Sequence, residues 1–162
     1  MLSNPRDLFL QELAELLWIE RTLEFELLPK LRDEAHDKDL RQAFAEHLAQ
    51  TREHVARVEQ AFRAAGAEAA SARSEAFEGL KSQHERQAQQ AKQSTLRDLV
   101  HAGGAARTEH VELAVYEALI GLARDLDLGE SADLLERNRG DEDEALKLLQ
   151  SLSERLRRAL PR

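Results

Sequence analysis

The chain contains no cysteine among its 162 residues. This absence excludes disulfide bonds, thiolate metal sites and thiol-based catalysis, and it fits a reducing compartment. Basic residues are also few, because 23 lysines and arginines stand against 31 aspartates and glutamates, which gives a net charge of -8. Phosphate recognition needs clustered Lys and Arg, so we expect no nucleic-acid partner.

Long hydrophobic runs are missing as well. The longest uncharged apolar stretch, residues 118–123, is far too short to span a bilayer, so we expect no membrane association. Residues 1–7 show no basic region followed by an apolar one, and no targeting signal is expected. The default expectation is a cytoplasmic protein. Its length and its 42% apolar content allow one substantial core, which predicts a single domain, 1–162.

Apolar side chains recur at helical spacing in the first part of the chain. Asn4 is a typical N-cap and Pro5 a typical first-turn residue, which predicts a helix over 5–32. That helix either tolerates Pro29 or kinks there. After a polar junction, a second helix is expected over about 38–65.

The middle of the chain has few large apolar residues. Residues 67–93 are rich in Ala, Ser, Gln and Glu, and Ser74 is a candidate cap for a short helix over 75–92. Such a helix would carry the chain back along the molecule, which would make the long helices on either side of it parallel.

Two further helices complete the expected architecture. The third runs over about 96–125 and the fourth continues towards residue 160. Ser94 is a candidate cap of the third helix, Gly129 a candidate end signal, and Ser131 a candidate cap of the fourth. The sequence therefore predicts an all-α four-helix bundle with a long, helix-containing crossover between its second and third helices.

Polar residues interrupt the apolar face of every long helix. Glu109 falls where the third helix should present a leucine, and Glu112 shares its face. The interruptions on the four helices are Glu20, His47, His54, Glu109, Glu112 and Glu142. All of them lie close to the midpoints of their helices.

Turn positions bring these residues to one height. In an antiparallel helical hairpin, residues equidistant from the turn face each other. A turn near residue 35 therefore places Glu20 opposite position 50, between His47 and His54. A turn near residue 127 places Glu112 level with Glu142. The sequence thus predicts one polar layer across the middle of the bundle.

The charge of such a layer must be compensated. An isolated buried carboxylate costs on the order of several kcal/mol even after relaxation, so protons, basic side chains or metal ions must neutralise it. Carboxylate oxygens and imidazole nitrogens are the donors expected of iron or manganese. We therefore expect two such ions, with an open position for dioxygen or peroxide. The expected roles are Glu20 and Glu142 as terminal ligands, Glu109 or Glu112 as a bridge, and His47 and His54 as nitrogen donors.

Several short motifs follow one another in a characteristic order: Leu28-Pro29-Lys30-Leu31, Gln42-Ala43-Phe44 with His47-Leu48, Glu109-His110-x-Glu112 with Tyr116, and Asp141-Glu142. In this order they resemble the YciE/YciF-type ferritin-like bacterial stress proteins, over about residues 8–158. The resemblance implies a ferritin-like domain, often a homodimer, that is associated with stress responses and has a candidate metal site. By position, the residues that match the family's inward carboxylates are Glu20, Glu109, Glu112 and Glu142.

Two positions depart from the pattern. Where family members commonly have Glu-Thr in the second helix, this chain has Gln50-Thr51, so Gln50 enters the ligand set as a neutral amide. No Glu-x-x-His occurs in the chain, and Ala145 stands three residues after Glu142. Both departures favour an alternative function, a metal-free helical structural or assembly stress protein whose layer is held by hydrogen bonds.

The remaining singled-out residues have simpler interpretations. Tyr116 is expected in the core with its hydroxyl bonded to a carboxylate. His84 and His101 lie outside the central layer and are expected to be structural or solvent-facing. Trp18 and Phe25 form an apolar flank on the first helix, which is typical of a dimer of bundles.

Overall fold

The computed structural model describes residues 2–160, and every regular element in that part is helical. The elements are α1 (Pro5–Thr22), η1 (Leu23–Leu27), α2 (Leu28–Glu34), α3 (Lys38–Ala64), α4 (Glu75–Gln90), α5 (Ser94–Asp125) and α6 (Gly129–Ala159). The all-α class expected from the sequence is confirmed. Residues 1, 161 and 162 of the expected 1–162 domain lie outside the described residues.

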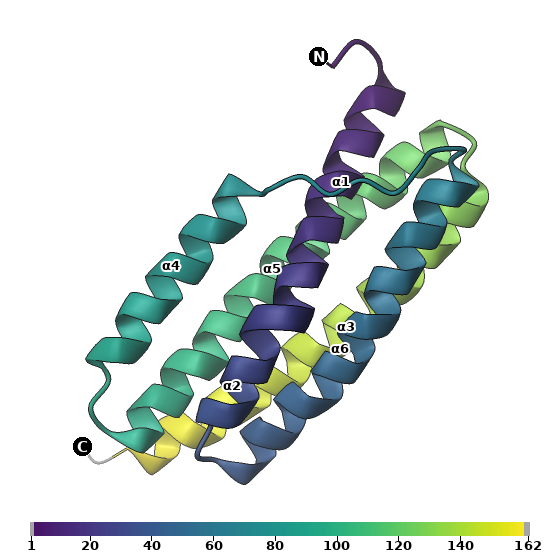
Figure 1. Ribbon diagram of the computed structural model, residues 1–162. Helices are drawn as coiled ribbons and strands as arrows, with labels where there is room; N and C mark the ends of the chain where they lie inside the picture. Colours follow the sequence, from purple (N-terminus) through teal and green to yellow (C-terminus); the bar gives the residue numbers. More distant parts are fainter. Residues whose placement is uncertain (1, 161–162) are drawn as a thin grey trace.

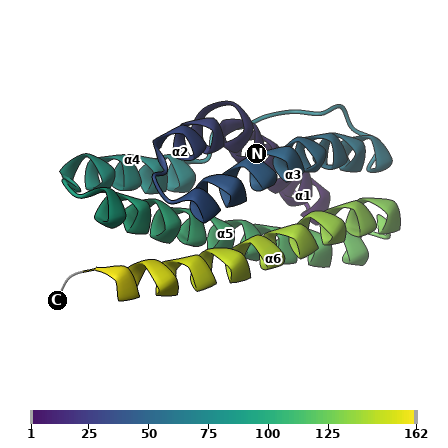
Figure 2. The ribbon, with the colours of Figure 1, turned by 90° about the horizontal axis from the view of Figure 1, so that it is seen from below.

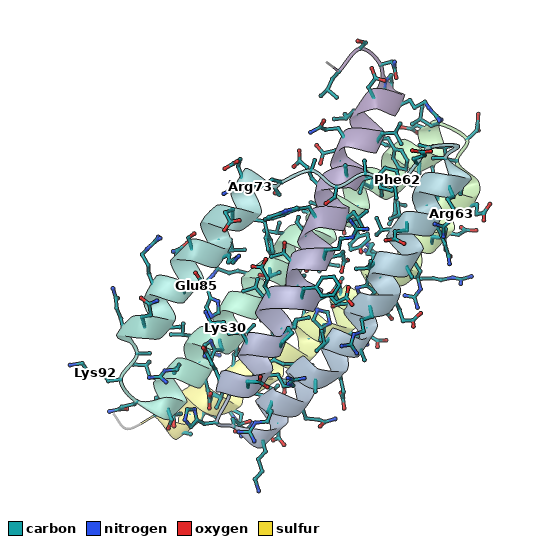
Figure 3. All side chains as sticks on the ribbon, in the orientation of Figure 1. Lys30, Phe62, Arg63, Arg73, Glu85 and Lys92 are labelled. Atoms are coloured by element: carbon teal, nitrogen blue, oxygen red, sulfur yellow. The ribbon has the colours of Figure 1, made fainter. Side chains whose placement is uncertain are left out.

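Four long helical stretches form the bundle (Figure 1). The continuous path of α1, η1 and α2 runs one way, α3 and α5 run the other way, and α6 returns. Seen from below, α5 and α6 form one layer and α1 to α3 the other (Figure 2). α4 carries the chain back beside α5, so α3 and α5 are parallel, as the expected crossover requires. Lys30 of α2 and Glu85 of α4, both labelled in Figure 3, lie 3.2 Å apart and help to hold α4 against the bundle.

Local capping explains where two of the helices begin. The Asn4 side chain accepts a hydrogen bond from the Asp7 N–H at 2.9 Å, at the start of α1. The Ser74 hydroxyl accepts one from the Phe77 N–H at 3.4 Å, at the start of α4. Each side chain satisfies a backbone donor that has no partner within the helix, and both predicted caps are confirmed.

Three other predicted end signals are wrong. Ser94 is the first residue of α5, with no side-chain hydrogen bond at that start. The chain reverses at Asp127, whose φ of 57° lies in the left-handed region that Asp tolerates, so Gly129 begins α6 instead of ending α5. Ser131 then falls in the first turn of α6, where its hydroxyl donates to the Ala61 carbonyl at 2.9 Å. Ser131 therefore joins α6 to α3 and does not act as a cap.

A π-helical turn accommodates the proline of the first long helix. In η1 the chain widens, and the Leu28 N–H donates to the Leu23 carbonyl, five residues earlier. Pro29, which has no N–H to donate, then lies in the first turn of α2. The helical path tolerates the proline and continues to Glu34, two residues beyond the expected end.

Two apolar clusters fill the bundle, one on each side of the polar layer. The first includes Leu28 and Phe44, and the second includes Phe9 and Phe62. Their burial supplies the main stabilising contribution, since removing apolar surface from water is favourable. None of the helices within residues 2–160 has both the length and the apolar character needed to cross a membrane.

The expected apolar flank on the first helix is only partly present. Trp18 packs edge-on against Phe77 of α4, with ring centroids 6.0 Å apart, so the crossover helix covers it. Phe25 lies on η1 and is 71% exposed. The sequence pattern does not show what α4 covers, so the predicted surface flank is wrong for Trp18, which is partly buried. The homodimer stays a prediction.

Candidate metal centre

Each long helical stretch contributes to one buried polar layer. α1 supplies one carboxylate, α3 both histidines, α5 two carboxylates and α6 one. All six side chains are buried, and four of them are completely so. The members of this layer are Glu20, His47, His54, Glu109, Glu112 and Glu142. The structure thus brings together the six buried residues that the sequence had placed at one height.

Five members of the layer form two groups that share Glu142. One group is Glu20, His54 and Glu142, and the other is His47, Glu109 and Glu142. Within each group, one potential ligand atom of every residue lies within 4.8 Å of those of the other two. The shared carboxylate presents a different oxygen to each histidine, Oε1 at 2.8 Å from His54 Nδ1 and Oε2 at 3.4 Å from His47 Nε2.

Each histidine also has an outer partner. His54 Nε2 lies 3.2 Å from Asp141 Oδ2, and His47 Nδ1 lies 3.3 Å from the Gln50 amide oxygen. Metal-binding histidines usually keep their second nitrogen on such an acceptor, which fixes the ring and its tautomer. Gln50 is therefore placed to orient His47, and its amide oxygen faces the nitrogen that points away from the two groups.

Several polar atoms of the layer have no hydrogen-bond partner among the described residues. Both oxygens of Glu112 and both of Glu142 are in this state, as are His47 Nε2 and His54 Nδ1. An unsatisfied buried polar group costs about 1–3 kcal/mol, and more when it is charged. The donor atoms lie close together without the alignment of hydrogen bonds, which is the arrangement expected of ligands around a shared cation. The residues present therefore fit a metal site.

The charges of the layer strongly perturb its acids and bases. Burial alone would lower the pKa of His54, but the charge of Glu20 and contact with Glu142 raise it to about 11. Burial opposes ionisation of Glu142 as well, but the two histidines lower its pKa to about 2. Burial and then the charge of Glu142 raise the pKa values of Glu109 and Glu112 well above the usual range. Protons on these last two carboxyls compensate the layer when no cation does, and a bound cation competes with them.

A hydrogen-bonded chain supports the Glu20 side of the layer. The Tyr116 hydroxyl donates to Glu20 Oε1, as the sequence predicted for this core tyrosine. The Asn138 amide donates to the Tyr116 hydroxyl at 3.0 Å and to the His54 carbonyl at 3.2 Å. Arg57 then bridges the Asn138 and Asp141 side chains, each at 3.0 Å. This chain holds both Glu20 and His54 in place.

Sequence reasoning missed Asn138 and Arg57 as parts of this support. Asn138 lies one helical turn before Glu142, so it shares the inner face of α6. Arg57 lies three residues after His54, on the neighbouring face of α3. The helical spacing was therefore a usable signal, but a single Asn or Arg on a helix has many possible partners and its pattern alone selects none.

Two further histidines form a separate pair between α4, which carries His84, and α5, which carries His101. His84 Nε2 lies 3.0 Å from His101 Nδ1, and both rings are buried. The expectation that they are structural fits this geometry, and solvent exposure is wrong for both.

Comparison with known proteins gives one family and several solved structures of the same fold. A family model described as "Domain of unknown function (DUF892)" matches residues 4–159. No curated protein matches the sequence significantly.

Solved structures match almost the whole chain. YcfI from Rhodopseudomonas palustris, named as a candidate structural protein, is 27% identical with a TM-score of 0.89, covering 91% of this chain and 94% of its own. The E. coli stress protein YciF is 24% identical with a TM-score of 0.92, and the match covers 98% of this chain and 100% of the YciF chain. A protein of Xanthomonas campestris pv. campestris is 20% identical with a TM-score of 0.77, and the match covers 96% of this chain and 95% of the Xanthomonas chain. The last two show the shared fold alone.

Proposed function

The chain belongs to the DUF892 family, and from this membership and the buried ligand layer we propose that it is a stress-response protein with a di-metal centre. The layer would bind two iron or manganese ions and handle peroxide or dioxygen. The family match and the likeness to YciF confirm the YciE/YciF-type resemblance expected from the sequence. The stress-response part of the proposal is carried over from the name of the E. coli protein.

The observation that carries the proposal is the state of Glu112. Its side chain is completely buried, and neither carboxylate oxygen has a hydrogen-bond partner within the described residues. A carboxyl group placed only for packing gains nothing from that position, because an apolar side chain would avoid the desolvation cost. Glu112 belongs to neither three-residue group, but it lies close enough to Glu142, Glu20 and Glu109 to feel their charges, so a cation in the layer would compensate its carboxylate.

The geometry favours particular roles for the ligands. One ion would be held by Glu20, His54 and Glu142, and the other by His47, Glu109 and Glu142. Glu142 is then the shared ligand, in contrast to the bridging role that the sequence assigned to Glu109 or Glu112. Gln50 and Asp141 would orient the two histidines.

Bound iron or manganese would supply the one-electron redox chemistry that the protein's own side chains lack. The chain itself provides a buried site that excludes most water. Tyr116 keeps Glu20 directed into the layer through its hydroxyl. These contributions fix the ligands before any ion binds.

A metal-free structural role is the second candidate function. It is favoured by Ala145, which stands where a Glu-x-x-His pair would supply a histidine. It is favoured also by the His54 and Glu142 contact, which compensates part of the charge without a metal. The name of the Rhodopseudomonas relative is consistent with it.

Elemental analysis separates the two candidates. Purified protein would be stripped with a chelator, reconstituted without oxygen with Fe²⁺ or Mn²⁺, desalted and assayed for metal. About two equivalents per chain are expected for the di-metal centre, and clearly less for Glu109→Ala and Glu112→Ala. Glu117→Ala is the matched control, because Glu117 lies on the same helix with its side chain 62% exposed. Metal-free wild-type protein after reconstitution would reject the di-metal proposal and leave the structural role.

A further inference from the structure

A cavity between α3 and α6 connects the ligand layer with the surface. Its volume is about 240 Å³, which leaves room for ordered water or a hydrated ion. His47 and Glu109 lie among its lining residues, together with Glu46 of α3 and Glu144 of α6. Glu46 and Glu144 are exposed, so they mark the mouth, whereas the two ligand residues are buried and mark the inner end.

The two halves of the ligand layer differ in how they meet this cavity. Glu20, His54 and Glu142 are completely buried. His47 and Glu109 line the cavity and retain 6% and 2% of their exposure. On the side that faces α4, the space beside Glu109 amounts to only about 20 Å³. The α3–α6 side is therefore the more open way to the layer.

The charge of the cavity selects the kind of particle that can enter. Its mouth carries the carboxylates of Glu46 and Glu144, and none of its lining residues is Lys or Arg. The nearby Lys147 is occupied by Asp143 at 2.6 Å. A cleft lined by one sign of charge with apolar walls concentrates counter-ions and repels ions of its own sign.

Unpartnered ligand atoms stand at the inner end. His47 Nε2 and Glu109 Oε2 have no hydrogen-bond partner among the described residues, and both belong to residues that line the cavity. An arriving cation therefore meets donors that are already desolvated. This feature distinguishes the cavity from an acidic patch on an ordinary helix surface.

Ala145 keeps the passage open. It lines the cavity one helical turn after Glu142, at the position where a Glu-x-x-His pair would place an imidazole. A methyl group leaves space that a larger side chain would fill. The departure that weakens the ligand set thus also creates access to it.

We propose that the α3–α6 cavity is the access route by which divalent cations reach the buried layer. Ions pass Glu46 and Glu144, meet His47 and Glu109 first, and reach the enclosed group of Glu20, His54 and Glu142 afterwards. This inference rests on the proposed di-metal function.

The rate of metal uptake tests the access route, whereas the final amount of metal bound per chain tests the site itself. Chelator-treated protein would be mixed with Co²⁺ in a stopped-flow instrument, and the visible absorption of the bound ion followed, with the final stoichiometry measured by elemental analysis. The double variant Glu46→Gln/Glu144→Gln is expected to bind the same amount of Co²⁺ roughly threefold to tenfold more slowly at low salt, and less slowly at high salt. Ala145→Phe, which obstructs the passage, should slow uptake at least about tenfold at any ionic strength.

The control for charge is Glu130→Gln/Glu154→Gln, which changes the net charge equally near the two ends of α6. It is expected to load at nearly the wild-type rate. Circular dichroism melting checks that Ala145→Phe is folded, and the mouth variants test the route even if it is not. Equal uptake rates with normal stoichiometry in wild type and the mouth variants would overturn the access route and leave the di-metal function intact. Absence of Co²⁺ binding by the wild type would overturn both.

Discussion

His54 Nδ1 lies 2.8 Å from Glu142 Oε1, inside the bundle, without the alignment of a hydrogen bond. The contact joins α3 to α6 at the height where the apolar core is interrupted. Because the other Glu142 oxygen faces a second histidine, this carboxylate occupies the centre of the layer. Because Glu142 has contacts on both sides, its removal should affect both halves of the site.

Removing the shared carboxylate should abolish both metal positions together. Glu142→Ala is expected to bind close to no Fe²⁺ or Mn²⁺, since each three-residue group loses a member. Glu20→Ala should retain about one equivalent, because the group of His47, Glu109 and Glu142 is left intact. Stoichiometry is measured by elemental analysis after reconstitution, with folding checked by circular dichroism.

Glu136→Ala serves as the control on α6, since its side chain is 43% exposed and lies outside both groups. A Glu142→Ala protein that still binds one equivalent would show that Glu142 is a terminal ligand of a single ion, as the sequence had predicted.

The Glu112 carboxyl should lower the free energy of unfolding when no metal is bound and raise it when metal is bound. In chelator-treated protein, Glu112→Met is expected to raise the free energy of unfolding by about 1–3 kcal/mol, because it removes a buried carboxyl whose oxygens have no partner among residues 2–160. With metal bound, the wild type should be more stable than Glu112→Met. At a free ion concentration 100 times the dissociation constant, the wild type gains about 2.7 kcal/mol, and the variant gains less.

Urea denaturation with and without Mn²⁺ measures both quantities. If Glu112→Met were less stable than the wild type in the metal-free state, the carboxyl would be making a structural contact, and the reasoning from unpartnered oxygens would be wrong.

Much of the fold could be predicted from the sequence because its signals are local. The caps at Asn4 and Ser74 and the helical spacing of leucines placed most helices within a few residues of their observed bounds. The predictions of helix ends were wrong where a contact with another helix determines the role of a residue. Ser131 has the composition of a cap, yet its hydroxyl is used by a carbonyl of α3, seventy residues earlier in the chain.

The sequence could predict which residues form the site, but not which of them contact one another. Distances from the turns place Glu20 and Glu142 at one height, and the structure agrees. Which carboxylate lies between the histidines depends on the rotation of each helix about its axis and on side-chain rotamers. Counting along the chain determines neither, so only the three-dimensional structure shows that Glu142 lies between the two histidines.

Gly104 should be essential because the His84 ring packs where a side chain at position 104 would lie. A Cβ added there would lie 2.7 Å from the ring carbon Cδ2 of His84, whereas one added at Gly103 meets nothing within 4 Å. Gly103→Ala is therefore expected to stabilise the protein by up to about 1 kcal/mol through helix propensity. Gly104→Ala should instead destabilise it by roughly 1–3 kcal/mol, since the ring must move.

The double-mutant cycle tests the cause of that loss. In a His84→Ala background the obstruction is gone, so Gly104→Ala should become neutral or stabilising, as measured by urea denaturation. An unchanged penalty in that background would show that the cost arises elsewhere on α5.

The His84 and His101 pair should make the stability of the protein depend on pH. Burial lowers the pKa of His84 to about 4, with further lowering by the charges of His101, Arg107 and Lys30 against the opposing effect of Glu85. The unfolded chain binds a proton on this histidine below about pH 6.5, and the folded chain does so only near pH 4. The contribution of the pair is therefore complete above pH 6.5 and is lost as the pH falls from 6.5 to 4.

The variant His84→Gln isolates this contribution from that of the many carboxylates. Glutamine can still hydrogen-bond to His101 but does not titrate, so its free energy of unfolding should fall less than that of the wild type between pH 7 and pH 4.5. The expected difference is roughly 1–2 kcal/mol, reduced from the full shift because a cavity open to the surface borders the pair. His110→Gln replaces an exposed histidine on α5, the helix that carries His101, and should follow the wild type. Parallel curves for all three proteins would mean that the pair is already protonated, or never is, across this range.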